Sequence, residues 1–191
     1  MSDFLIWSNN PQGYDCSLTD FQGMEKTFPL LAGAPLAEEF PSDASFRMEP
    51  EDPQNTRLTD SLANTNAVVV GSQKLVDFFS EHKVPEVEFL PVTVFDHKGK
   101  PVATPYSIIH PIHPIDCLDL ENSQPRYSKI LPDQINKVES LVLLEDKIPE
   151  DRVFFRCLNF YRVIIARRSF AEQIKAAGMT GVDWTELTDY P

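Results

Sequence analysis

The sequence is poor in glycine and cysteine, and each shortage argues against a class of function. Its 7 glycines form neither a GxGxxG nor a GxxxxGK[ST] motif, so no glycine-rich phosphate-binding loop is recognisable. The 3 cysteines, Cys16, Cys117 and Cys157, lie far apart without CxxC spacing. This pattern is typical of reduced thiols and favours a cytoplasmic protein.

Long hydrophobic runs and positive charge are also lacking. No apolar stretch approaches the roughly 20 residues that cross a bilayer, and Met1–Ser8 has no basic region of the kind that begins a signal peptide. Lysine and arginine total 17 against 29 acidic residues, which gives a formal net charge of −12. Nucleic acids and anionic membranes both bind basic surfaces. We therefore expect neither as a partner.

The negative charge is distributed unevenly. Residues 1–65 contain 11 acidic residues against Lys26, Arg47 and Arg57, a net charge of −8. Between Arg152 and Arg168 the sign reverses, because this segment has 5 arginines and no acidic residue. One interpretation is solvated faces with internal ion pairs. The other is that the acidic half steers a basic protein partner onto the surface.

The N-terminal third has little periodicity. Residues 1–8 favour a short strand docked on the main sheet, whereas residues 9–56 are rich in Pro, Asp, Glu, Ser and Gly. Such frequent prolines exclude long helices. We expect residues 1–58 to form a loop-rich acidic N-terminal arm packed on the body, and residues 59–191 to form an α+β domain.

From residue 59 onward the pattern is regular. Ser72 is placed to cap a helix over 73–82, and Pro91 should force an edge position or a bulge. A short helix is expected at 59–64, and strands at 68–70, 87–89, 92–95, 106–109, 141–144, 153–155 and 160–166. Asp96–Lys100 should form a turn in which Gly99 adopts a positive φ.

Two segments resemble each other. Near the C-terminus a strand leads to a helix, which is followed by a returning strand. Ser169 and Glu172 form a capping box at the start of this helix, and Gly178 ends it in a left-handed conformation. A similar order surrounds Ser72. The sequence therefore predicts an α+β fold with a strand-rich mixed sheet and two main helices, built from two weakly similar strand–helix–strand units.

The segment His110–Asp119 contains the one cluster of residue types that could bind a metal. His110, His113, Cys117 and Asp119 are all possible zinc ligands, but their spacing matches no common site. A strand or loop with incidental histidines is the favoured interpretation, and a metal-dependent or hydrolytic enzyme is the alternative. Ser72 lacks the flanking glycines of a nucleophile elbow. We expect no metal, cofactor or catalytic residue.

The order of several short motifs points to a family. These are Asp60-Ser61-Leu62, Val68–Ser72, Val87–Val92, Tyr106-Ser107-Ile108, Ile115–Asp119, Val153–Arg156 and Thr180-Gly181-Val182. The order resembles, over residues 60–187, the eleventh bacterial immunity-protein family of polymorphic toxin systems, first recognised around a Myxococcus protein. This resemblance implies cytosolic binding and neutralisation of one cognate bacterial toxin domain without catalysis. Residues 9–56 show no such resemblance.

Toxin contact is expected on the acidic arm. Proline lowers the conformational entropy that this segment would lose on binding, and the acids create a local field. The candidate toxin-binding residues are Glu38, Glu39, Asp43, Glu49, Glu51 and Asp52. A solvated acidic loop without a partner is the alternative, and the arginine-rich region 152–168 is the next candidate surface.

Overall fold

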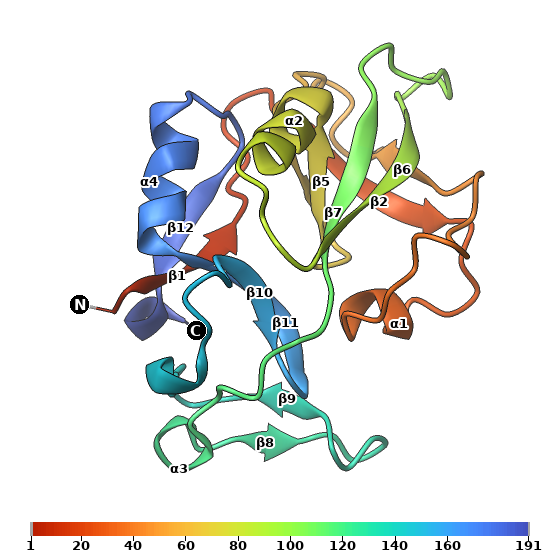
Figure 1. Cartoon of the computed structure of the whole chain (residues 1–191). Coiled ribbons are helices and arrows are strands. Elements are labelled where there is room, and N and C mark those ends of the chain that lie inside the picture. The colour runs from red at the N-terminus through yellow and green to blue at the C-terminus, as the bar shows by residue number, and fades with distance from the viewer. Residues whose placement is uncertain (1, 191) are drawn as a thin grey trace.

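The computed structural model describes residues 2–190 and contains three sheets (Figure 1). Six strands form a closed barrel in the order β2-β3-β6-β7-β5-β4, four form a sheet in the order β10-β11-β1-β12, and β8 pairs with β9. Strands dominate, so the α+β class is confirmed in outline. The expected single mixed sheet is wrong, because the strands divide between the barrel and a separate sheet.

The barrel is assembled from both halves of the sequence. Its strands are β2 (Ser17–Gln22), β3 (Ser45–Met48), β4 (Ser61–Asn64), β5 (Val69–Ser72), β6 (Val87–Phe95) and β7 (Tyr106–Pro111). The pairs β2–β4 and β3–β6 are parallel, and the other neighbours are antiparallel. Phe46, Leu62, Val70 and Ile108 are fully buried in its interior. Closure gives each of these strands a neighbour on both sides over at least part of its length.

Strand β6 changes partner along its length. Residues Val87–Val92 pair with β7, and Thr93–Phe95 pair with β3. Pro91 is exposed and lies opposite Ser107 of β7, in the part of β6 that has no partner in β3. The absence of an N–H group on Pro91 therefore removes no hydrogen bond between β6 and β3.

The four-stranded sheet joins the two ends of the chain. Strand β1 (Phe4–Ser8) lies between β11 (Phe160–Arg167) and β12 (Asp183–Glu186), antiparallel to both, and β10 (Phe154–Cys157) pairs with β11. The strand expected in residues 1–8 is thus confirmed, in an inner position of the sheet.

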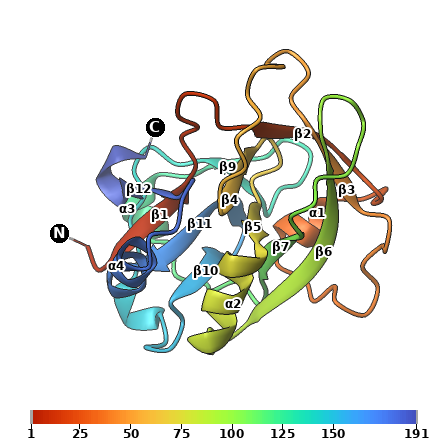
Figure 2. The ribbon, with the colours of Figure 1, turned by 90° about the horizontal axis from the view of Figure 1, so that it is seen from above.

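Two helices join the sheet to the barrel. They are α2 (Gln73–Glu81) and α4 (Arg168–Ala176). The Phe79 ring of α2 makes edge-to-face contacts with Phe170 of α4, at 5.1 Å between centroids, and with Phe154 of β10, at 5.0 Å. Seen from above, α2 lies between the side of the molecule with α4 and the side with β3 and β6 (Figure 2). Buried aromatic pairs of this kind stabilise the junction.

The remaining elements are short. They are α1 (Phe28–Leu31), α3 (Leu120–Ser123), β8 (Arg126–Tyr127), β9 (Ile135–Lys137) and two 3-10 turns, η1 (Glu145–Lys147) and η2 (Leu187–Asp189). Within residues 2–190, no helix has both the length and the apolar character needed to cross a membrane.

The two strand–helix–strand segments lie in different sheets. Helix α2 connects β5 to β6, and both strands are antiparallel to β7 between them. Helix α4 connects β11 to β12, and both are antiparallel to β1. Each helix therefore crosses over one intervening strand.

Several local expectations are corrected. Residues 9–56 contain β2, α1 and β3, two of which are barrel strands, because Leu18 and Phe46 face the barrel core. Residues 61–64 form β4 instead of a helix. The strand expected at 141–144 is reduced to an isolated bridge between Leu118 and Leu143. The division into residues 1–58 and 59–191 stays a prediction about folding units.

The helix ends follow the sequence signals in part. The Ser72 hydroxyl accepts a hydrogen bond from the Leu75 N–H, which confirms it as the N-cap of α2. Gly178 has a φ of +65°, as expected of a left-handed helix end. The capping box of Ser169 is wrong, because the N-cap of α4 is Arg167, two residues earlier.

Candidate functional site

Strand β3 separates the six candidate acids into two groups. Glu38, Glu39 and Asp43 precede Ser45–Met48, whereas Glu49, Glu51 and Asp52 follow it. All are exposed except Glu49, which is half-buried. A strand of this length spans roughly 10 Å, so the two groups lie at opposite ends of β3. The structure does not gather the six carboxylates at one point.

The turn that carries Glu38 and Glu39 is held by a carboxylate of β6. One oxygen of Glu88 accepts hydrogen bonds from the N–H groups of Leu36, at 2.7 Å, and Ala37, at 3.1 Å. Charge-assisted bonds to backbone N–H groups are stronger than neutral ones. The two exposed acids therefore project from a backbone fixed to the barrel.

The same segment is held a second time by β7. The Nε2 atom of His110 lies 2.8 Å from the carbonyl oxygen of Ala34, and the His113 N–H donates to the Gly33 oxygen at 2.9 Å. A carbonyl oxygen only accepts, so Nε2 of His110 carries the proton. Burial lowers the pKa of His110, although the bond to Ala34 opposes the shift.

The segment that carries the second group of acids forms a hydrogen-bonded turn. The Glu49 N–H donates to the Ser17 oxygen at 2.9 Å, which extends the contact of β3 with β2. The Glu49 carboxylate accepts from the Glu51 N–H at 3.3 Å, and the Asp52 N–H donates to the Glu49 oxygen at 3.2 Å. Glu49 thus stabilises its own turn, which leaves Glu51 and Asp52 more available to a partner.

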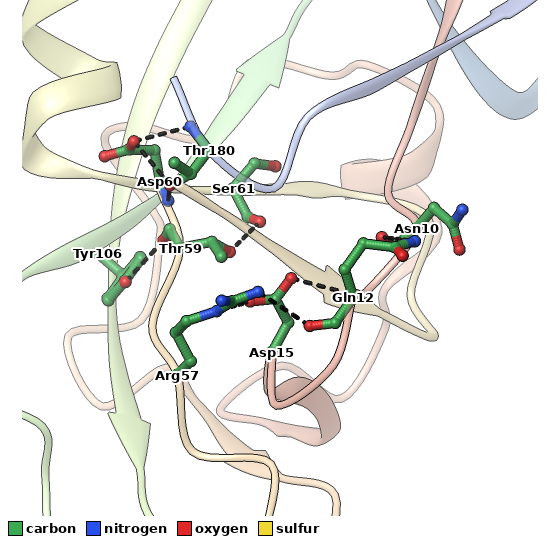
Figure 3. A network of polar contacts seen from close by, with 9 residues as sticks. All are labelled: Asn10, Gln12, Asp15, Arg57, Thr59, Asp60, Ser61, Tyr106 and Thr180. Carbon is green, nitrogen blue, oxygen red and sulfur yellow. Dashed lines mark hydrogen bonds and ion pairs between the residues drawn. The ribbon is translucent and has the colours of Figure 1, made fainter. Parts of the chain in front are cut away.

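Within residues 2–190, none of the six acids forms an ion pair. Other acids do so and have structural roles. Nε of Arg57 donates to the Asp15 carboxylate at 2.5 Å, and a second guanidinium nitrogen donates to the Gln12 oxygen at 2.9 Å (Figure 3). The hydrogen bond from Arg57 lowers the pKa of Asp15.

Asp60 is the second structural acid. Its carboxylate accepts from both the N–H and the hydroxyl of Thr180, each at 2.9 Å (Figure 3). It also accepts from the Ser72 hydroxyl at 2.9 Å. Lys74 approaches to 3.5 Å. Burial raises the pKa of Asp60, but these bonds outweigh it and the net shift is downward. Asp60 therefore ties the barrel to the segment after α4.

The residues of the His110–Asp119 cluster point to separate neighbours. His113 pairs with Glu86 at 2.5 Å, and the Cys117 sulfur lies 3.6 Å from that of Cys157 in the core. Asp119 caps α3 by accepting from the Asn122 N–H at 3.0 Å. Among the described residues, no group of three or more His, Cys, Asp and Glu side chains is arranged to hold a metal ion.

Most of the arginines between Arg152 and Arg168 make internal contacts. Arg152 donates to the carbonyl oxygens of Ile112 and His113, and Arg156 donates to those of Tyr161 and Ala67. The Arg167 guanidinium lies over the Phe4 ring. Arg168 forms a bidentate ion pair with Glu186. Arg162 differs, because it is exposed and forms no ion pair within residues 2–190. The segment is therefore not a continuous basic surface.

Sequence reasoning missed the roles of Glu88 and Arg162. Glu88 lies in the alternating pattern of β6 and reads as a solvent-facing strand residue, and only the approach of residues 33–37 gives it a role. Arg162 is recognised as unpaired only when the contacts of the other four arginines in the segment are known.

The comparison with known families covers nearly the whole chain. A model described as Immunity protein family (Imm11) matches residues 8–189. The match includes residues 9–56, so the expectation that this segment lies outside the family is wrong. The expected lack of a family counterpart therefore gives no reason to place toxin specificity in this segment. No curated protein matches the chain.

Proposed function

The chain belongs to the Immunity protein family (Imm11), and we propose from this membership that it binds one cognate toxin and neutralises it by occlusion, without catalysis. The resemblance found in the sequence is confirmed by the family match. Neutralisation by occlusion requires a tight complex, because any free toxin continues to act. We expect a dissociation constant of about 1 nM or lower.

The unpaired acids support the acidic segment around β3 as a contact surface. Glu38 and Glu39 stand on a turn fixed by Glu88 and His110, so their backbone loses little conformational freedom when a partner binds. Carboxylates without internal cations are free to attract a basic surface and to raise the association rate. The two ends of β3 then provide two separate contact points.

The binding role does not depend on a reactive group. The histidines and cysteines of the 110–119 segment are engaged with Ala34, Glu86 and Cys157. We propose that the encounter takes place in the cytoplasm, which is supported by three free, buried cysteines.

The test uses the toxin domain encoded beside the gene for this chain. We expect the purified proteins to form a 1:1 complex by calorimetry and size-exclusion chromatography, and the chain to protect cells that express the toxin. Protection that needs an equimolar amount of the chain supports occlusion. Failure to form a complex contradicts the proposal, and protection at far below equimolar amounts would indicate an enzyme.

A further inference from the structure

A cavity of about 370 Å³ lies where the barrel meets the four-stranded sheet. Its walls come from β2, from α1 and its preceding residue, from the turn at residues 65–67, from β11 and from the residue before β9. They include the apolar residues Phe21, Leu30, Leu31 and Tyr161, the polar residues Thr27, Thr65, Asn66 and Gln134, and Arg162. Cavities of this size between two substructures are common binding sites.

A buried arginine holds two of these walls together. Arg156 is 1% exposed, and its guanidinium donates to the Tyr161 oxygen at 2.5 Å and to the Ala67 oxygen at 2.6 Å. Burial lowers its pKa to about 9, so the group is still charged at neutral pH. Within residues 2–190 it forms no ion pair. Burying a cation without an anion is unfavourable.

The turn that Arg156 holds is itself strained. Ala67 has a φ of +54°, a left-handed conformation that alanine rarely adopts. The Asn64 side chain fixes the same turn, donating to the Val68 oxygen at 2.7 Å and accepting from the Asn66 N–H at 3.0 Å. Strained backbone held by its surroundings is concentrated at binding and active sites. The cavity wall at residues 65–67 is therefore held in place by both Arg156 and Asn64.

Arg162 supplies the charge of this cavity. It belongs to the wall formed by β11, it is exposed, and no carboxylate of the described residues pairs with it. A free guanidinium presents parallel N–H groups that match a carboxylate. The cavity thus combines apolar and neutral polar residues with one cationic residue, Arg162.

The surroundings of the cavity favour an acidic and apolar occupant. The β8–β9 hairpin, which contributes Gln134 to the wall, carries Lys129 and Lys137 against Asp133, and its Arg126 is paired with Glu139 at 2.8 Å. Its loop exposes 88% of Ile130. On the other side Phe28 of α1 is 46% exposed, with its ring 5.9 Å from that of Tyr161. Exposed apolar groups beside a cavity are typical of protein contacts.

We propose that this cavity docks a segment of the toxin, with an apolar side chain inserted between α1 and β11 and a neighbouring carboxylate paired with Arg162. The inference rests on the proposed immunity function and adds a second contact to it. Helix α1 links the two contacts, because Leu30 and Leu31 line the cavity and the chain then runs to Glu38 and Glu39. A basic and an acidic contact on one surface would fix the orientation of the toxin.

The experiment measures toxin affinity for two variants that change the cavity in different ways. Arg162→Glu reverses the charge, and Thr65→Trp fills the space from an exposed wall residue. We expect each to weaken the complex at least ~30-fold, the scale of a central interface residue. Arg162→Lys keeps the charge but removes the planar guanidinium that can bind a carboxylate through two N–H groups. It should therefore weaken the complex to an intermediate extent.

The control is Lys175→Glu, which makes the same change in net charge at an exposed position of α4. In both views α4 lies on the opposite side of the molecule from α1 (Figures 1 and 2). We expect less than a ~3-fold change in affinity, and equal melting temperatures for all variants would show that the fold is retained.

Two outcomes separate this inference from the function on which it rests. If the unmodified chain binds the toxin and both Arg162→Glu and Thr65→Trp bind equally well, the cavity is not a contact and the inference fails alone. If the unmodified chain does not bind the toxin, the proposed function fails first.

Discussion

The Nε2 atom of His110 lies 2.8 Å from the carbonyl oxygen of Ala34, so a buried side chain of β7 fixes the segment that leads to Glu38 and Glu39. The sequence suggested His110 as a possible zinc ligand. In the structure it holds the base of the acidic turn, and Glu88 holds the same turn two residues further on.

His110→Leu should destabilise the protein. The substitution removes the donor to Ala34 and leaves its carbonyl without that bond, which costs about 1–3 kcal/mol. Urea unfolding measures this change, and His110→Gln, which retains a donor, should lose less. Equal midpoints for the unmodified chain and His110→Leu would show that the contact contributes nothing to stability.

Stability should fall as the pH is lowered through the ordinary pKa of histidine, about 6.5. Burial lowers the pKa of His110 in the folded chain, so below that pH the unfolded chain binds a proton that the folded chain does not. The His110 contribution is therefore present above pH ~6.5 and is lost on acidification. Urea midpoints at pH 7.5 and 5.5 should differ less for His110→Gln, and an equal difference would assign the pH dependence to other groups.

Reversing the acids before β3 should slow association with the toxin. The triple variant Glu38→Lys, Glu39→Lys, Asp43→Lys removes an attractive field, so the association rate should fall about tenfold or more at low salt. The effect should shrink at physiological ionic strength, where the Debye length is about 8 Å. Stopped-flow measurements at two salt concentrations test this.

The matched variant Glu49→Lys, Glu51→Lys, Asp52→Lys makes the same total charge change at the other end of β3. If the toxin binds beside residues 38–43, the first triple variant should lower the association rate more than the second. Equal slowing would indicate long-range steering without a defined contact. No slowing by either would place the contact elsewhere.

Gly181→Ala should be far more destabilising than Gly178→Ala. Both glycines have positive φ, +76° and +65°, so alanine is strained by about 1–2 kcal/mol at either site. At Gly181 the new Cβ would also lie 2.2 Å from the Ser61 oxygen, whereas at Gly178 nothing lies within 4 Å. Thermal unfolding of the two variants compares them directly, and similar losses would mean that the Ser61 segment moves aside freely.

The sequence predicted what local chemistry determines. Ser72 caps α2 because its hydroxyl is positioned by the preceding strand, and Gly178 ends α4 because glycine tolerates positive φ. The same reasoning failed at Ser169. There the strand runs on to Arg167, and Arg168 is held by Glu186 and Ser2, so the helix begins two residues too early for Ser169 to cap it.

The barrel strands β2 and β3 could not be recognised locally. They are short, their faces are mixed, and their partners are distant in sequence, as the pairing of Ser45 with Thr93 shows. The prolines that indicated loops are compatible with order, since Pro29 lies in the first turn of α1. The sequence identified six acidic candidates but not how they are arranged. Their separation into two groups depends on β3, which the sequence did not predict.

The position of β1 has a consequence for how the protein is made. Strand β1 is synthesised before all its partners, because its two neighbours, β11 and β12, lie in residues 160–186. During translation β1 has no partner until residues 160–186 have left the ribosome, and pairings of such long range form slowly. Under the proposed function, only copies whose synthesis has passed β12 can bind the toxin, so we expect folded protein to be present before the toxin arrives.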